Sequence, residues 1–159
     1  MKKAIAIVAA GLMSFGAVDT AFAGYALRPL NTKFTGTGTT SATKNGVTLK
    51  CNAKFEGSVN GQGVGEITGG SFTGELGCTS VGLQNLPWKS TATSMSKVQI
   101  SGAEFTSPIG NCGPGNLSVT LRSGVVSFSN LPLKGGCTVS GNLKTSPTLK
   151  IVSVMPTFF

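Results

Sequence analysis

The sequence predicts an all-β domain, either an antiparallel β-sandwich or a partly closed barrel, with about eight to ten short strands and two disulfides. Three observations support this prediction. Apolar and polar residues alternate with a period of two in several runs, glycine-rich turn signals separate these runs, and four cysteines follow an N-terminal export signal. After Ala23 no apolar pattern with a helical period lasts three turns, since Gly, Thr or Pro interrupts it.

Residues 1–23 have the organisation of a cleaved signal peptide. Lys2 and Lys3 form its positive start, residues 4–17 are apolar or small, and an Ala-Phe-Ala triplet at 21–23 matches the small-x-small cleavage pattern. The apolar stretch is shorter than the roughly 20 residues that cross a bilayer as a helix. We therefore expect export, cleavage after Ala23, and a mature single domain over residues 24–159 that lacks a transmembrane span.

Along the mature chain, the clearest strand covers residues 47–55, where apolar residues at odd positions alternate with polar residues at even positions. The same alternation recurs at 117–121 and 139–143. Asn-Gly pairs at 45–46 and 60–61 are typical of tight turns, because both residues tolerate positive φ angles. The segment around Tyr25 and Arg28 fits either an edge strand or a loose tail. Further strands are expected at residues 33–40, 63–72, 88–93, 97–105, 124–131 and 148–154.

All four cysteines, Cys51, Cys78, Cys112 and Cys137, lie in the exported part, where disulfides form and persist. Sequence spacing alone allows three pairings. The two halves of the chain resemble diverged copies, each with a first cysteine, two apolar runs and a Gly-Cys-Thr triplet. This repeat favours Cys51 with Cys78 and Cys112 with Cys137. We expect both bonds to be structural, because no base or helix N-terminus suggests a reactive thiol.

The mature chain contains neither His nor Asp, so it cannot assemble a Ser-His-Asp triad, a Cys-His pair or a His-based metal site. Its carboxylate side chains are four glutamates, at 56, 66, 75 and 104, and no feature of the sequence pairs them for glycoside hydrolysis. Neither a dinucleotide-binding fingerprint nor a Walker loop is present. We therefore expect a protein that is not an enzyme, with no catalytic, cofactor-binding or metal site.

Excess positive charge is the main indication of partners. The whole chain has a formal net charge of +8, which becomes +7 once Lys2, Lys3 and Asp19 are removed with the signal peptide. Such a charge favours anionic surfaces, such as the bacterial cell envelope or a matrix polysaccharide. Proteins that bind nucleic acid normally cluster their basic residues, whereas the lysines here are scattered singly, which argues against nucleic acid as a partner.

Three aromatic residues are candidates for surface contacts: Trp88, Phe158 and Phe159. Trp88 is the single tryptophan, and a lone aromatic residue in a strand-rich domain is also typical of a core position. The C-terminal Phe pair, together with Met155, offers apolar area for a hydrocarbon surface. A terminal Phe also resembles the closing strand of outer-membrane barrels, but the cysteines, the short strands and the few aromatic residues argue against that class.

Several segments resemble one known family. They are Phe-Thr-Gly-Thr-Gly at 34–38, Gly-Val-Thr-Leu-Lys-Cys at 46–51, Asn-Leu-Pro-Trp at 85–88, Gly-Cys at 136–137 and Thr-Ser-Pro at 145–147. In them the chain resembles the PraB-like secreted activators of alkane oxidation, over nearly all of its mature length. The resemblance implies an extracellular, non-enzymatic protein, associated with biofilm or the cell surface, that promotes growth on insoluble hydrocarbon. It implies no active-site residues.

From the resemblance and the basic composition we expect a secreted protein that promotes alkane oxidation from the cell surface, the biofilm matrix or the oil–water interface. Two alternatives stay open. Thr- and Val-rich edge strands also fit a self-assembling structural or adhesive subunit, which would be a homo-oligomer. A carbohydrate-binding module is the second alternative, with Trp88 and Tyr25 as its obvious aromatic contacts.

Overall fold

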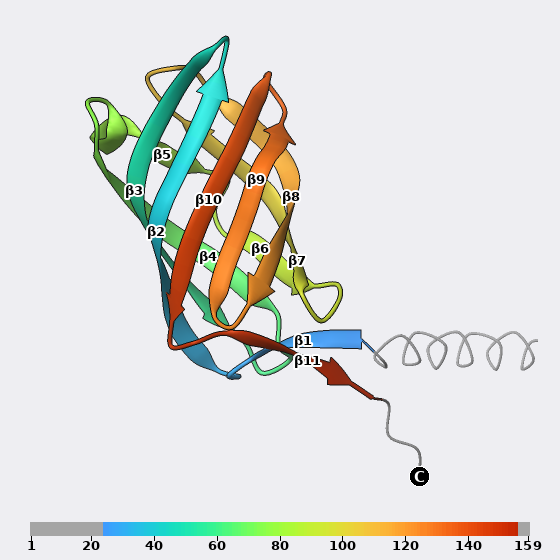
Figure 1. Ribbon diagram of the computed structural model, residues 1–159. Helices are drawn as coiled ribbons and strands as arrows, with labels where there is room; N and C mark the ends of the chain where they lie inside the picture. The colour runs from blue at the N-terminus through green and yellow to red at the C-terminus, as the bar shows by residue number, and fades with distance from the viewer. Residues whose placement is uncertain (1–23, 156–159) are drawn as a thin grey trace, which may run out of the picture.

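The computed structural model describes residues 24–155, and within them eight strands close into an antiparallel β-barrel (Figure 1). A further strand, β5 (Gly82–Gln84), pairs with β7, and a single-turn 3-10 helix, η2 (Cys78–Ser80), precedes it. Strand β8 pairs with β7 and thereby closes the ring. In spatial order around the barrel the strands are β7 (Lys97–Thr106), β6 (Trp88–Ala92), β4 (Gly65–Gly74), β3 (Val47–Val59), β2 (Thr32–Lys44), β10 (Cys137–Ser146), β9 (Val125–Leu133) and β8 (Cys112–Arg122).

The prediction of an antiparallel all-β domain with two disulfides is confirmed, and of the two architectures considered the barrel is the one present. It is closed rather than partly closed, because β7 and β8 pair from Lys97 and Thr120 to Phe105 and Cys112. Some strands are longer than expected, since β2 and β3 have 13 residues each and pair along their full length. Long strands suit a barrel, in which ring closure gives strand edges a partner.

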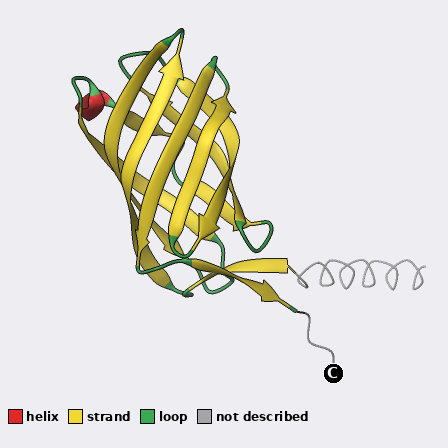
Figure 2. Cartoon of the chain, viewed as in Figure 1, coloured by secondary structure: helices red, strands yellow, loops and turns green. Residues whose placement is uncertain are grey.

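A small second sheet lies at one end of the barrel (Figure 2). It consists of β1 (Gly24–Arg28) and β11 (Lys150–Val154), which pair antiparallel. The segment around Tyr25 is therefore an ordered strand and not a loose tail. As drawn in Figure 1, we call this the lower end of the barrel, and we call the opposite end, where the β2–β3 and β9–β10 turns lie, the upper end.

The period-two pattern of the sequence sorts side chains between the inside and the outside of the barrel. Strand β3 is buried at residues 49, 51, 53 and 59, whereas Lys50, Asn52 and Lys54 are exposed. Strand β8 repeats the pattern, with buried residues at 117, 119 and 121. Because successive side chains of a strand point to opposite faces, the apolar half of each pattern forms one core inside the ring.

Glycines that face inward make room for aromatic rings. The ring of Phe34 lies against Gly57, and the ring of Phe128 lies against Gly141. A Cβ atom added at Gly57 would lie 2.7 Å from the Phe34 ring, and one added at Gly141 would lie 2.5 Å from the Phe128 ring. Large and small inward residues therefore face one another, as in other small barrels whose interiors are filled by side chains.

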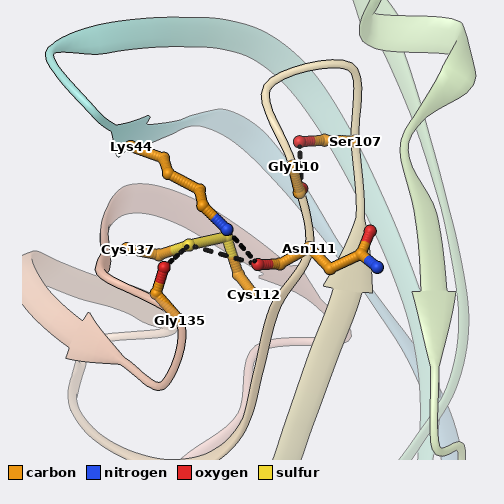
Figure 3. The surroundings of a disulfide bond; sticks show 7 residues. All are labelled: Lys44, Ser107, Gly110, Asn111, Cys112, Gly135 and Cys137. Atoms are coloured by element: carbon orange, nitrogen blue, oxygen red, sulfur yellow. Dashed lines mark hydrogen bonds between the residues drawn. A yellow bond between two sulfur atoms is a disulfide. The ribbon is translucent and has the colours of Figure 1, made fainter.

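Both disulfides lie in the upper half of the molecule and join Cys51 to Cys78 and Cys112 to Cys137, which is the pairing that the internal repeat favoured. Figure 3 shows the surroundings of the second bond. The Nζ atom of Lys44, at the end of β2, donates a hydrogen bond of 2.9 Å to the carbonyl oxygen of Asn111. This contact holds the β7–β8 loop against β2 beside the disulfide.

Candidate functional site

The interior of the barrel contains two apolar cavities. An upper cavity of about 80 Å³ extends toward Leu49 and Cys51, and a lower cavity of about 110 Å³ extends toward Leu27 and Leu149 in the region of the small sheet. Among residues 24–155, no charged side chain lines either cavity. Protein interiors are close-packed and contain few voids larger than a water molecule, so two such cavities in one small barrel are a candidate binding site.

Four side chains line both cavities and separate them; we call this set the partition, and it consists of Phe55, Trp88, Leu117 and Phe128. Trp88 is only 5% exposed, and its indole nitrogen donates a hydrogen bond of 2.7 Å to the carbonyl oxygen of Gln84. The ring of Phe55 is tilted against it, with 6.4 Å between the ring centroids. Because the same four residues contribute to the lining of both cavities, the partition is the boundary between them.

The barrel wall beside the upper cavity has a seam without backbone pairing. Strand β4 pairs with β6 only from Gly65 to Ile67, and β5 pairs with β7. In the described part of the chain, no ladder joins residues 68–74 of β4 to β5. The seam is bordered instead by Phe72, Val81 and Leu83, which are half-buried and line the upper cavity.

Side-chain packing closes this seam. Leu83 lies so close to the backbone of β4 that a Cβ atom added at Gly70 would be 2.8 Å from its Cδ1 atom. The ring of Phe72 meets the partition residue Phe55 edge to face, with 5.5 Å between centroids. Side-chain contacts, and not a backbone ladder, therefore close the wall between β4 and β5.

At the lower cavity, in contrast, backbone groups and one buried hydroxyl form hydrogen bonds beside the lining. The amide of Leu27 donates to the carbonyl oxygen of Gly63 at 2.9 Å. The hydroxyl of Thr145 donates to the carbonyl oxygen of Gly124 at 2.7 Å and accepts from the amide of Leu149 at 3.0 Å. These bonds hold Leu27 and Leu149 in place, and both leucines line the lower cavity.

Comparison with known proteins identifies the family. A family model described as alkane oxidation protein activator, PraA/PraB-like, matches residues 1–153. The chain belongs to this family. No curated protein and no solved structure matches it. The resemblance seen in the sequence is thus confirmed. The PraA/PraB-like family is named for activation of alkane oxidation, and the two disulfides of this member are consistent with export.

Of the three aromatic residues predicted to make surface contacts, the structure describes only Trp88. Trp88 is buried in the partition of this PraA/PraB-like barrel, so the prediction of a surface contact there is wrong and the core position is correct. Phe158 and Phe159 lie outside the described residues, as does the predicted signal peptide at 1–23. Met155, which we grouped with the Phe pair, is exposed.

The glutamates do not gather into a site. Glu56, Glu66 and Glu75 are exposed and Glu104 is half-buried, and none of them lines a cavity of the interior. Glu56 lines a shallow surface depression beside Lys33, where no second carboxylate is present. Within residues 24–155, no three His, Cys, Asp or Glu side chains lie close enough together to hold a metal ion. Over the same residues, no helix is long and apolar enough to cross a membrane.

Apart from Trp88, the residues that line the cavities were not predicted to be functional from the sequence. The apolar face of the strand predicted at 47–55 already placed Phe55 inside, and the strand predicted at 124–131 contains Phe128. One further signal was present. Ser90 follows Trp88 by two positions and so interrupts the apolar face of the strand predicted at 88–93. Empty space between such side chains depends on how the ring closes, and the sequence does not encode that locally.

Proposed function

We propose that this chain is an exported, non-enzymatic protein that promotes alkane oxidation by accepting hydrocarbon chains into its barrel, at the cell surface, in the biofilm matrix or at the oil–water interface. The observation that carries the proposal is the pair of apolar cavities behind a seam that side chains close. Family membership supplies the connection to alkanes. Three of the four glutamates are exposed and one is half-buried, and none lines either interior cavity, which supports a role without catalysis.

The energetics favour an alkyl chain in this interior. Each CH₂ group that moves from water into an apolar site contributes about 0.8 kcal/mol. An apolar cavity of about 150 Å³ in another protein stays dry and binds benzene. The upper and lower cavities are each smaller than that, but together they exceed it. A chain that spans both must displace side chains of the partition, so we expect the partition to set the length that is accepted.

Partial insertion explains why such a protein would work at an interface. A long alkane is larger than the two cavities, so only one end enters and the remainder stays at the seam or in the oil. Phe72, Val81 and Leu83 border the seam and offer the remainder an apolar surface. The protein would then wet or disperse the hydrocarbon and present chain ends to the cell.

A row of basic residues on the outside supports attachment to an anionic envelope or matrix polysaccharide. Lys144 of β10 and Lys54 of β3 both pair with Thr37 of β2, so they lie on either side of it on the outer face. Lys50 lies four residues before Lys54 on the same face of β3. Exposed charges are screened over about 10 Å at 0.1 M salt, so we expect this attachment to weaken as salt is raised.

The test of the proposed function is growth on an insoluble alkane. In a strain from which the gene has been deleted, added mature protein should restore growth on hexadecane and leave growth on a soluble substrate unaffected. Ala42→Leu adds bulk at the lining of the upper cavity and should restore less growth. Thr43→Leu is the matched control, because it adds the same side chain at the next residue of β2, outside the cavity linings. Equal growth with both variants would count against uptake into the barrel.

A self-assembling subunit is the second candidate, and the free edge of β4 favours it. Residues 69–74 contain no Lys or Pro, the residues that commonly protect an exposed edge from pairing with another chain. Concentration-dependent light scattering of the purified protein, abolished by Ser71→Lys, would support this candidate. If the scattering corresponds to a monomer at every protein concentration, the self-assembling subunit is ruled out. The carbohydrate-binding alternative loses its main support, because Trp88 is buried and Tyr25 alone is exposed of its two proposed contacts.

A further inference from the structure

Ser90 is a buried polar residue without a partner. It lies on β6 between the inward-facing residues Trp88 and Ala92, where the period of the strand calls for an apolar side chain. It is 5% exposed and lines the lower cavity. Among the described residues, its hydroxyl oxygen is the one buried side-chain nitrogen or oxygen atom that has no hydrogen-bond partner. Buried polar groups are nearly always paired, so this hydroxyl requires an explanation.

The other buried hydroxyl of the lower cavity shows what a structural role looks like. Thr145 is 3% exposed, and its hydroxyl both donates to Gly124 and accepts from Leu149. That residue closes the lower end of the barrel and has no need of a ligand. The Ser90 hydroxyl performs no such role, because within residues 24–155 it bonds to neither backbone nor side chain.

A lone water molecule does not satisfy Ser90 well. Buried waters typically make about three hydrogen bonds to polar groups that lack other partners. The side-chain polar groups that line the lower cavity are Ser90 and Thr145, and the Thr145 hydroxyl already donates one hydrogen bond and accepts another, which leaves it a single acceptor site. A water in this cavity would therefore find little beyond Ser90 itself. A ligand that brings its own oxygen on an otherwise apolar body fits better.

We propose that the lower cavity binds the hydroxyl end of a primary alcohol, with Ser90 as its hydrogen-bond partner and the alkyl chain directed through the partition toward the upper cavity. The proposal rests on the proposed function, because it assumes that alkyl chains enter the barrel. Oxidation of an alkane at its terminal carbon gives a primary alcohol. The barrel would therefore hold the first product of the reaction as well as the hydrocarbon.

The chemistry of the lining selects an alcohol over a carboxylic acid. Neither cavity is lined by a charged side chain, so a carboxylate would be buried without a counter-ion, which is strongly unfavourable. A serine hydroxyl has one donor and two acceptor sites, and an alcohol hydroxyl complements both. An alkane binds in the same space but leaves Ser90 without a partner.

The intrinsic fluorescence of Trp88 provides the measurement. It is the only tryptophan of the chain and lines both cavities, so its emission reports their occupancy. The mature protein is titrated with 1-hexanol, with hexane and with hexanoate at neutral pH. Ser90→Ala should weaken 1-hexanol binding about five- to tenfold and leave hexane binding unchanged, since one hydrogen bond is lost. Hexanoate should not place its carboxylate beside Ser90, so Ser90→Ala should leave its affinity unchanged.

The matched control is Ser118→Ala, which removes the same hydroxyl from an exposed position of β8 outside the cavity linings. It should change neither titration. If hexane binds and Ser90→Ala leaves the ratio of 1-hexanol to hexane affinity unchanged, the role of Ser90 is overturned while uptake of hydrocarbon stands. If neither hexane nor 1-hexanol changes the emission of Trp88, both this inference and uptake into the barrel are wrong.

Discussion

The two ends of the barrel are closed by different means. The upper half is tied by both disulfides, whereas the lower end is covered by β1 and β11 through hydrogen bonds and the buried side chains of Leu27 and Ile151. The seam between β4 and β5 lies beside the upper cavity. The half that has covalent bonds is thus the half whose wall is incompletely paired. Covalent bonding there allows a weak place in the wall without loss of the fold.

The two disulfides also differ from each other. Cys112 and Cys137 belong to the main core of the barrel, while Cys51 and Cys78 form a separate small cluster with Leu49. Their sequence separations are 25 and 27 residues, so the chain-entropy model gives both about 3.5 kcal/mol. Any difference between them must therefore come from what each bond holds in the folded state. The bond between Cys112 and Cys137 joins two strands of the ring, β8 and β10. The bond between Cys51 and Cys78 joins β3 to the segment that follows β4.

The largest expected effect is loss of the bond within the ring. Replacing Cys112 and Cys137 together with Ala should lower the free energy of unfolding by about 4 kcal/mol, since lost packing in the main core adds to the chain-entropy contribution. Urea unfolding followed by far-ultraviolet circular dichroism measures this change. A loss below about 1 kcal/mol would show that the ring does not depend on this bond.

At the lower end, Leu27→Ala should lower the free energy of unfolding by about 3 kcal/mol. Leu27 is 2% exposed and lines the lower cavity, so its truncation both removes buried apolar area and enlarges an existing void. The same urea titration measures the loss. The variant should also bind benzene more tightly than the wild-type protein, detected by the emission of Trp88. A stable variant with unchanged benzene affinity would mean that the lower end collapses onto the space.

The strand pattern was largely predictable from sequence because it is local. The alternation at 47–55 lies within β3, and the Asn-Gly pair at 45–46 forms the β2–β3 turn with φ angles of 52° and 78°. The disulfide pairing also followed from a repeat within the chain. These features depend on neighbouring residues or on self-similarity, which a single sequence displays.

Closure of the ring was not predictable in the same way. A sandwich and a barrel use the same inward and outward alternation, and the choice depends on contacts between distant strands, such as β2 with β10. The alternation placed Gly141 on the apolar face of its strand, but the ring of Phe128 that lies against it comes from another strand and was not predicted. For the same reason, the sequence left two positions open for Trp88, one on the surface and one in the core. Ser90 was visible as a break in the pattern, but its lack of a partner is a property of the whole interior.

The bond between Cys51 and Cys78 tests whether the upper half controls access. Replacing both residues with Ala should cost about 2 kcal/mol, at the lower end of the range for a disulfide, because the segment after β4 can detach while the ring persists. The rate of hexane uptake, followed by stopped-flow emission of Trp88, should rise severalfold. The Leu27→Ala variant is the comparison, since it changes the cavity but not the seam. Equal uptake rates in the wild-type and disulfide variants would remove this bond from any role in access.

The smallest expected effect on stability, and the most specific to the seam, belongs to Leu83→Ala. Leu83 is half-buried and packs on Gly70 across the seam, so its truncation should cost only about 1 kcal/mol. It should nevertheless raise the rate of hexane uptake severalfold, because it removes a side chain that closes the wall. Leu131→Ala is the matched control: Leu131 is also half-buried against the core, but it lies on β9 and lines neither cavity. If both variants take up hexane at the same rate, access follows general loosening of the barrel, and the seam is not the route.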